Sequence, residues 1–254
     1  MIMEKLSVVI ITKNEEANIG RCLKSVEWAD EIVVVDSGST DRTADICREF
    51  GVVFIETEWK GFGTTKDFAF SKAKNDWILS IDADEVVSDK LKDEIIAVLK
   101  DEQRKNAYKI RFEIYYLKRK IRFSGMRREY HLRLFDRKQG GIATSVIHEG
   151  IKINGEVGVL NAPIYHHTIP DINKHLNKIK TYTRLSAEKK FEAGKKVSLA
   201  GVVFRSIFTF IRIYFFLGGF LDGQPGFVFA ANSAVYTYFN YLFLWELNYR
   251  ERTR

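Results

Sequence analysis

Two aspartates separated by one residue give this chain its sharpest chemical signal. Asp82 and Asp84 directly follow Trp77–Ile81, an apolar run typical of a buried strand. Residues two apart in an extended segment share a face, so both carboxylates are expected in one crevice. Open α/β sheets bind ligands beyond the carboxyl ends of their strands, and hard divalent cations take carboxylate and phosphate oxygens together. The pair predicts either a metal and sugar-hydroxyl site, or an acidic turn that caps the next helix.

Two further polar segments follow apolar runs. The turn Asp36–Asp41 contains Gly38, which lets a backbone approach a ligand, and it precedes a helix whose first N–H groups favour anions. Thr12–Glu15 follows the first apolar run and should reach the same crevice. An ordinary capped helix and ordinary strand-to-helix punctuation are the alternatives. The sequence contains neither a Walker GxxxxGK[ST] loop nor a GxGxxG fingerprint.

Histidines and a glutamate in the second half are weaker candidates. Glu149, next to His148, has the chemistry of a general base, although a surface glutamate is the more common outcome. His166 and His167 close a predicted strand. Adjacent strand residues point to opposite faces, so at most one of the two would bind a metal there.

The elements that must position these residues alternate along the first hundred residues. Apolar, β-branched runs predict four buried strands: Leu6–Ile11, Glu31–Val35, Val52–Ile55 and Trp77–Ile81. Between and after them the pattern predicts four helices: roughly 15–28 capped by Asn14, about 42–50, 65–74, and from Ser88 to about Gln103. This alternation predicts an α/β fold with a mostly parallel sheet and helices on both faces.

The middle of the chain changes to half-exposed strands. Alternating or apolar runs predict strands at Tyr108–Tyr115, Tyr130–Phe135 and Val157–Tyr165, followed by a basic helix over 171–193.

Composition and charge narrow the class of protein. The chain has 254 residues, 46% of them hydrophobic, which excludes wholesale disorder. Its two cysteines, Cys22 and Cys47, fit a reducing compartment and buried free thiols. Residues 1–103 carry 13 basic and 22 acidic side chains, whereas residues 104–254 carry 27 and 11. The acidic half suits a metal, and the basic half suits phosphates, nucleic acid or an anionic membrane. No nucleic-acid-binding motif accompanies that charge.

The last segment is apolar and aromatic. Residues 201–245 contain three charges, and the stretches 199–221 and 227–245 are each long enough to span a bilayer. Arg205 and Arg212 are seven apart and therefore share one helix face, which favours a helix lying in the membrane interface. No secretory signal is visible, so the expected location is the cytoplasm, peripherally on the inner face of the cytoplasmic membrane.

Three strand-end motifs occur in an order that resembles the inverting family 2 glycosyltransferases. They are Ser-Val-Val-Ile-Ile-Thr-Lys-Asn-Glu, Ile-Val-Val-Val-Asp-Ser-Gly-Ser-Thr-Asp and Trp-Ile-Leu-Ser-Ile-Asp-Ala-Asp-Glu. The later part is similar to a narrower group, the bacterial lipopolysaccharide inner-core β-1,4-glucosyltransferases. That similarity rests on Gly61–Ala69, Val-Ile-His-Glu149, His166-His-Thr, and the tail from Phe204-Arg to Trp-Glu246.

The resemblance implies a fold, a donor and a set of binding residues. It implies a GT-A, Rossmann-like catalytic domain over 1–165 and a basic, amphipathic helical region over 166–254. The donor would be a nucleotide sugar, UDP-glucose for the narrower group. The residues implied to bind it are Thr12 and Glu15 in the nucleotide pocket, Asp36 at the base, Lys66 at the nucleotide and Asp82 at the ribose.

The resemblance also implies the reaction. Asp84 would hold Mg²⁺ or Mn²⁺ on the diphosphate, and Glu149 would deprotonate the acceptor hydroxyl for a single inverting displacement. The acceptor would be a lipid-linked or phosphorylated glycan at an anionic membrane surface. The arginines expected to contact acceptor or membrane are Arg127, Arg128, Arg205 and Arg212.

Three other functions stay open on the sequence. Transfer to polyprenyl phosphate would make the apolar tail a set of spans, against which Arg205 and Arg212 count. A non-catalytic, membrane-bound nucleotide-binding protein would keep the fold but never transfer a sugar. A nucleic-acid binder is the least favoured interpretation.

Overall fold

The computed structural model describes residues 4–126, 129–143, 150–169 and 171–252. Its first half confirms the predicted β-α alternation. The parallel strands are β1 (Leu6–Thr12), β2 (Glu31–Asp36), β3 (Val53–Glu56) and β4 (Trp77–Asp82). The helices among and after them are α1 (Ile19–Val26), α2 (Thr43–Glu49), α3 (Phe62–Lys72) and α4 (Asp89–Lys100).

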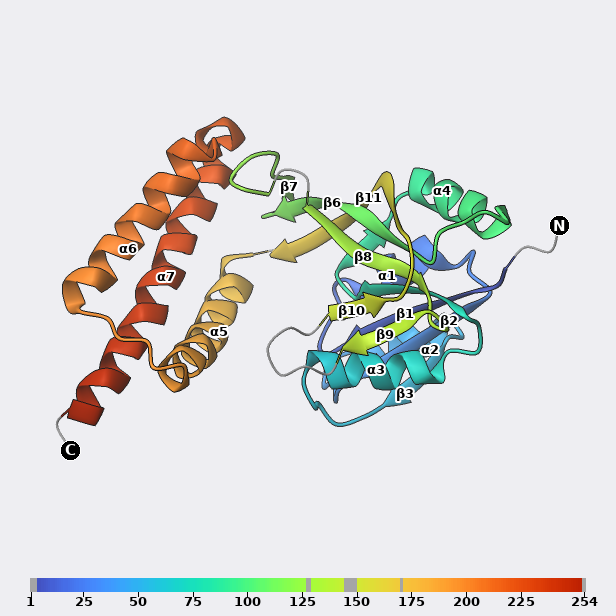
Figure 1. The fold of residues 1–254 in the computed structure, drawn as a ribbon, viewed down its shortest axis with the longest axis horizontal. Helices are drawn as coiled ribbons and strands as arrows, with labels where there is room; N and C mark the ends of the chain where they lie inside the picture. Colours follow the sequence, from blue (N-terminus) through green and yellow to red (C-terminus); the bar gives the residue numbers. More distant parts are fainter. Residues whose placement is uncertain (1–3, 127–128, 144–149, 170, 253–254) are drawn as a thin grey trace. The chain divides into compact units, whose positions relative to one another are not determined.

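The apolar runs of β1, β2 and β4 form mostly buried strands because both faces of the sheet are covered there, whereas the predicted burial of β3 is wrong, since it is the edge strand and its side chains are exposed or half-buried. Every residue of β1 is buried. Val9 and Ile11 pack with Ala69 and Phe70 of α3, which lies across β1 and β2 in Figure 1. Val8 and Ile10 point to the opposite face and are also fully buried. The predicted fold class, an α/β sheet flanked by helices with a helical C-terminal extension, is confirmed.

The prediction that Asn14 caps the first helix is wrong. Helix α1 begins at Ile19, and Asn14 adopts φ 54° in the turn before it. The Asn14 side-chain oxygen accepts a hydrogen bond from the Thr40 N–H at 2.8 Å. Asparagine tolerates the left-handed region, and its short amide bonds local backbone readily. Asn14 therefore joins the two turns that follow β1 and β2.

Antiparallel strands extend the sheet beyond β4. Their bounds are β5 (Glu85–Val87), β6 (Ala107–Tyr116), β7 (Arg119–Lys120), β8 (Glu129–Asp136) and β11 (Val157–Ile169). The strand order is β3-β2-β1-β4-β8-β6-β11-β5, with β7 paired to β6. Strands β9 (Gly140–Ala143) and β10 (Gly150–Ile153) form a separate pair. Strand β8 thus lies directly beside β4, the strand that carries the aspartate pair.

The chain divides into two compact units. The first comprises Met1–Glu113 and Arg128–His166, and the second comprises Ile114–Arg127 and His167–Arg254. The second contains α5 (Ile172–Glu192), α6 (Leu199–Ile211) and α7 (Gly223–Arg252). A π-helical turn, η1 (Arg212–Phe216), and a 3₁₀ turn, η2 (Gly219–Asp222), lie between α6 and α7. The domain boundary at 165/166 stays a prediction.

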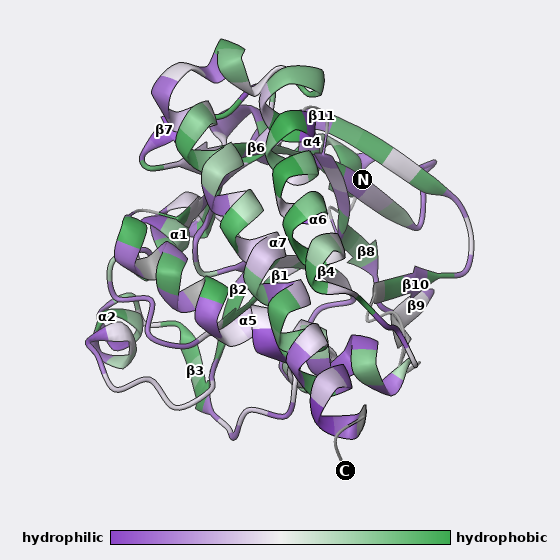
Figure 2. Cartoon of the chain, turned by 90° about the vertical axis from the view of Figure 1, so that its left-hand side faces the viewer, coloured by the Kyte–Doolittle hydropathy of each residue, from purple (hydrophilic) through white to green (hydrophobic). Residues whose placement is uncertain are grey.

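Helix α7 packs against both α5 and α6 in the second unit. Figure 2 shows hydrophobic residues along the length of α6. Within the part of the chain that the structure describes, one helical segment, Leu199–Phe216, is long and apolar enough to cross a membrane, with a mean hydropathy of 1.6. A buried polar triad also ties this unit together, because the Tyr116 hydroxyl meets His175 Nδ1 at 2.9 Å and accepts from Asn232 at 2.9 Å.

Helix α4 begins with the predicted cap, and this contact can be tested. The Ser88 Oγ accepts a hydrogen bond from the Leu91 N–H at 3.2 Å. Ser88→Ala should lower the free energy of unfolding by about 1 kcal/mol, because an N–H at the start of the helix loses its acceptor. Urea denaturation measures the change, with Ser88→Thr as the matched control that keeps a hydroxyl. Equal losses in both variants would contradict the capping role.

Candidate functional site

The polar segments after the first, second and fourth strands meet at one edge of the sheet. Parallel pairing aligns Thr12 with Asp36 and Ile11 with Asp82. The carboxyl ends of β2, β1 and β4 therefore lie side by side. This is the position at which open α/β sheets bind ligands.

Asp36 organises the turn after β2. One of its carboxylate oxygens, Oδ2, accepts hydrogen bonds from the Gly38 N–H at 3.0 Å and the Ser39 N–H at 2.7 Å. Gly38 has φ 81°, and no other atom lies within 4 Å of where its Cβ would be. Glycine is thus needed there for its backbone angle, and the space above it stays open to a ligand.

Three buried hydroxyls lie near this edge. Within the described residues, the Oγ atoms of Thr12, Ser37 and Thr65 are buried and have no hydrogen-bond partner. Thr12 and Ser37 end neighbouring strands, and Thr65 lies on α3, which packs against β1 and β2. A buried hydroxyl without a partner costs free energy.

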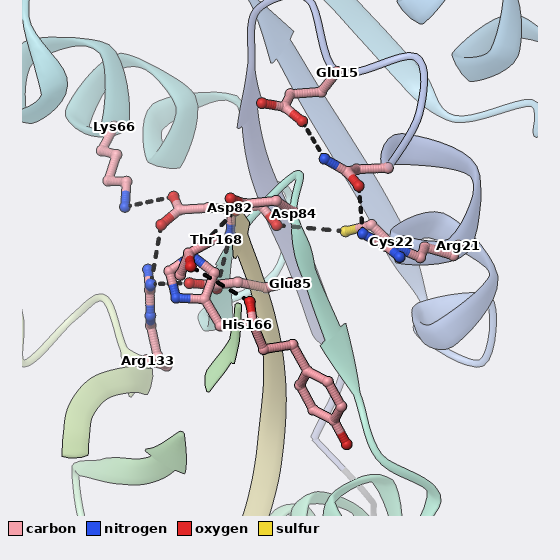
Figure 3. A network of polar contacts seen from close by, with 12 residues as sticks. Glu15, Arg21, Cys22, Lys66, Asp82, Asp84, Glu85, Arg133, His166 and Thr168 are labelled. Carbon is pink, nitrogen blue, oxygen red and sulfur yellow. Dashed lines mark hydrogen bonds and ion pairs between the residues drawn. The ribbon is translucent and has the colours of Figure 1, made fainter. Parts of the chain in front are cut away.

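Asp82 is held between two cations. Lys66 Nζ lies 2.8 Å from its Oδ1, and Arg133 Nη2 lies 3.0 Å from its Oδ2. Figure 3 shows Lys66 and Arg133 approaching the carboxylate from different elements, α3 and β8. Burial alone would raise the pKa of Asp82, but Arg133 and Lys66 outweigh it and hold that pKa well below its usual range. Asp82 is therefore ionised.

Arg133 also pairs with Glu85. The Glu85 side chain is fully buried, and its Oε1 lies 2.5 Å from Arg133 Nη2. Its other oxygen accepts the Asp82 N–H at 2.9 Å. Burial raises the pKa of Glu85 to about 7, although the Arg133 charge opposes the shift. Arg133 is thus a cation shared by the buried Glu85 and the partly exposed Asp82.

Asp84 has a different neighbour. Its Oδ1 lies 3.4 Å from Nε2 of His166, which β11 places opposite Glu85 of β5. Burial would lower the pKa of His166, but the hydrogen bond to Asp84 and the nearby carboxylates raise it. Among the described residues no group of three or more potential metal ligands occurs. Asp84 and His166 nevertheless fit a divalent cation that takes its other ligands from a diphosphate and water.

Glu15 is engaged away from the aspartate pair. Its Oε2 accepts a hydrogen bond from the Asn18 side chain at 2.5 Å, at the start of α1. The predicted general base Glu149 and the predicted acceptor contacts Arg127 and Arg128 lie outside the described residues.

Polar side chains of β8 lie in a row beside this site. His131 Nε2 lies 2.7 Å from Glu129 Oε1. The His131 ring packs edge-on against Phe112, which also contacts His166. Sequence reasoning gave no role to Arg133 or His131. The alternation in Tyr130–Phe135 was the available signal, because it places these two side chains on one face of the strand.

Comparisons with known proteins identify the family of this chain. Residues 7–151 match the family model described as glycosyl transferase family 2. An uncharacterized glycosyltransferase of Rickettsia typhi is 34% identical over 259 residues, covering 96% of this chain and 87% of the relative. The lipopolysaccharide core biosynthesis glycosyltransferase LpsC of Rhizobium meliloti is 31% identical over 240 residues, covering 92% and 89%.

One solved structure shows the same fold. It is the mannosyltransferase PcManGT from Pyrobaculum calidifontis, in complex with GDP-Man and Mn²⁺. Its TM-score is 0.52 at 16% identity, with 93% of this chain and 74% of that chain covered.

The buried pair of Arg133 and Glu85 can be tested by removing one charge at a time. Arg133→Met should lower the free energy of unfolding by about 3–5 kcal/mol at pH 8, because two carboxylates lose their shared cation. The loss should be smaller at pH 6. Without Arg133 the raised pKa of Glu85 rises further, so the folded variant holds a proton on Glu85. The difference in unfolding free energy between the variant and the native chain therefore grows as pH increases.

The controls use the same denaturation measurement. Arg133→Met combined with Glu85→Gln should lose less than Arg133→Met alone, because glutamine keeps the acceptor for the Asp82 N–H and removes one charge. Arg48→Met breaks an exposed pair with Asp45 and should cost less than about 1 kcal/mol. If Arg133→Met lowered the free energy of unfolding as little as Arg48→Met does, the Arg133–Glu85 pair would not stabilise the fold.

Proposed function

Because the chain belongs to glycosyl transferase family 2, we propose that it transfers a hexose from a nucleotide sugar to a lipid-linked glycan. The proposed donor is UDP-glucose, and the proposed acceptor is the inner-core heptose of lipopolysaccharide. The observation that carries the donor site is the convergence of Thr12, Asp36, Asp82 and Asp84 on one sheet edge. Support for the acceptor comes from the relative LpsC, which is named for lipopolysaccharide core biosynthesis.

The nucleotide would bind across the ends of β1 and β2. Asp36 orders the turn after β2 by accepting the Gly38 and Ser39 N–H groups, and Thr12 at the end of β1 stays the second proposed contact of the nucleotide. Asp82, fixed by Lys66 and Arg133, is positioned for the ribose side. Those two cations keep its carboxylate ionised, and Lys66 is close enough to the same edge to meet a phosphate.

Asp84 would hold the divalent cation, with His166 as a second protein ligand. When bound, this cation supplies positive charge for the leaving diphosphate. Carboxylate, phosphate and water oxygens suit both Mg²⁺ and Mn²⁺. The PcManGT structure contains Mn²⁺ with GDP-Man, and we propose Mg²⁺ or Mn²⁺ for this site.

The acceptor would approach along the row formed by β8. Phe112 offers an apolar ring between His131 and His166, and Glu129 and His131 offer hydrogen bonds. Arg127 and Arg128 precede Glu129 in the chain and stay the proposed contacts for acceptor phosphates. Glu149 stays the proposed base: it takes the acceptor hydroxyl proton while that oxygen attacks the anomeric carbon and the bond to the nucleoside diphosphate breaks. Attack from the opposite face inverts the configuration.

The inner face of the cytoplasmic membrane is the proposed location, because a lipid-linked acceptor is presented there. Arg205 and Arg212 stay proposed membrane contacts. Arg205 is exposed on α6, with its guanidinium 4.9 Å from the ring centre of Tyr241 on α7. Transfer to polyprenyl phosphate would use the same donor site, so an acceptor assay with both lipids separates the two reactions.

The donor and metal roles can be tested by thermal denaturation. UDP-glucose with Mn²⁺ should raise the Tm of the native chain by several degrees, since a ligand at a hundred times its Kd adds about 2.7 kcal/mol. Asp84→Ala should lose this shift while its Tm without ligand stays unchanged. Asp89→Ala, an exposed aspartate on α4, is the matched control and should keep the shift. A full metal-dependent shift in Asp84→Ala would remove the assigned metal role.

The base can be assigned by comparing two glutamates. Glu149→Gln should slow glucosyl transfer about a hundredfold or more, because general-base catalysis contributes on that scale, and should keep the UDP-glucose shift in Tm. Glu129→Gln should transfer at a rate within about tenfold of the native chain. The reverse pattern would place the base at Glu129, which lies near His131 and Arg133; the sequence offers Asp136 as the other alternative. Asp136 accepts the Lys138 N–H.

A further inference from the structure

Helix α6 carries a broad apolar face that is exposed. The large apolar residues on it, each more than a third exposed, are Leu199, Val203, Phe204, Ile207, Phe208 and Ile211. At about 100° per residue they cover roughly half of the helix circumference. The polar side chains Ser206 and Thr209 face α7 instead and bond to it. Arg205 and Arg212 fall at one edge of the apolar face and do not interrupt it.

The apolar face continues into the turns between α6 and α7, which we call the hairpin tip (residues 212–222). Phe215, Phe216, Phe220 and Leu221 are each at least half exposed there. Phe216, at 75%, is the most exposed large hydrophobic residue in the described part of the chain. Soluble monomers rarely expose contiguous apolar surface of this kind, which marks a site for a partner or a membrane.

A cationic segment is fastened to the tip. We call Lys118–Arg122 the basic loop. The Asp222 carboxylate accepts hydrogen bonds from the Arg122 N–H at 2.8 Å, the Phe123 N–H at 3.0 Å and the Ser124 hydroxyl at 2.9 Å. The Ser124 N–H also donates to the Leu217 carbonyl at 2.9 Å. These bonds fix the residues that end the basic loop against η1 and η2.

The charge of this surface is predominantly positive. The basic loop exposes Lys118, Arg119, Lys120 and Arg122. Residues 114–127 contain no acidic residue, and Asp222 is the only acidic residue in 199–245. Asp222 accepts its hydrogen bonds from backbone N–H groups and a hydroxyl, which carry no net charge. The aromatic tip therefore lies beside a cluster of cations.

The tip also contains a shallow pocket of about 440 Å³. It is lined by Phe123, Gly125, Phe216, Leu217 and Gly218. Gly218 has φ 71° and Gly125 has φ 85°, so both positions favour glycine. The residues that line the pocket carry no charged side chain.

We propose that the α6 face, the hairpin tip and the basic loop together form a docking surface for an anionic lipid bilayer. The phenylalanines of the tip enter the boundary between headgroups and acyl chains, α6 lies parallel to the membrane, and the loop cations bind headgroup phosphates. The inference rests on the proposed function in one respect: docking would give the enzyme access to a lipid-linked acceptor.

A second copy of this chain is a poorer occupant. In a two-fold dimer made through this surface, both basic loops would join one interface, and their like charges would oppose pairing. An anionic membrane complements both the apolar face and the charge. Lipid binding, not self-association, is therefore the expected behaviour.

Vesicle flotation with the full chain tests the proposal. Vesicles of phosphatidylcholine with 30 mol% phosphatidylglycerol should bind about tenfold or more better than phosphatidylcholine alone, and high salt should reduce that advantage. Phe216→Ser with Phe220→Ser should lower binding to anionic vesicles about tenfold or more. Lys118→Gln, Arg119→Gln and Arg122→Gln together should abolish the preference for anionic lipid. Leu185→Ser removes a residue that is 51% exposed on α5 and should bind like the native chain.

Three results would overturn the proposal. They are equal binding to both vesicle types, a dimer in sedimentation that the tip substitutions dissociate while vesicles stay unbound, or resistance of the membrane-bound chain to alkaline carbonate, which indicates a span. The UDP-glucose shift in Tm is measured on the same variants. A kept shift with lost flotation separates failure of docking from failure of the donor site, and a lost shift with kept flotation indicates the reverse.

Discussion

A carboxyl group in a protein interior needs a partner, and the Glu85 side chain has no exposed surface at all. Its partner Arg133 comes from β8, far along the chain, so the end of the parallel sheet is completed only when β8 pairs antiparallel with β4. The same guanidinium then reaches Asp82, and Lys66 of α3 takes the other oxygen of that aspartate. Arg133 thus connects β8 to Glu85 and to Asp82, and Asp82 in turn connects that strand to Lys66 of α3.

The part of this site that the sequence could predict is the part built from local signals. Apolar runs predicted β1, β2 and β4, and each ends at a polar residue that the sequence singled out. Parallel pairing then brings these ends together, because neighbouring parallel strands run in one direction. Thr12 therefore lies opposite Asp36, and Ile11 opposite Asp82, without any long-range information beyond the strand pattern.

The rest of the site depends on strand order, which local patterns do not encode. The sheet order is β4-β8-β6-β11-β5, so β11 pairs with β5 although the two strands are far apart in sequence. This pairing brings His166 of β11 next to Asp84, which precedes β5. Nothing in the residues around His166 distinguishes it from its neighbour His167, whose ring stacks on Tyr115 at 4.9 Å. Asn14 failed as a predicted cap for the same kind of reason, because its partner Thr40 follows a different strand.

Asp82 and Asp222 show how the partner of a carboxylate decides what charge the surrounding surface carries. Lys66 and Arg133 bring positive charge to Asp82, so the negative charge left at that strand end belongs to its neighbours, Asp84 among them. Asp222 is satisfied by groups without net charge, so it anchors the segment after the basic loop without bonding to the loop's cationic side chains. The spacing and types of the residues do not predict this difference. A short acidic motif therefore predicts where a carboxylate lies in the fold. The elements that pack against that carboxylate determine whether it is structural or available to a ligand.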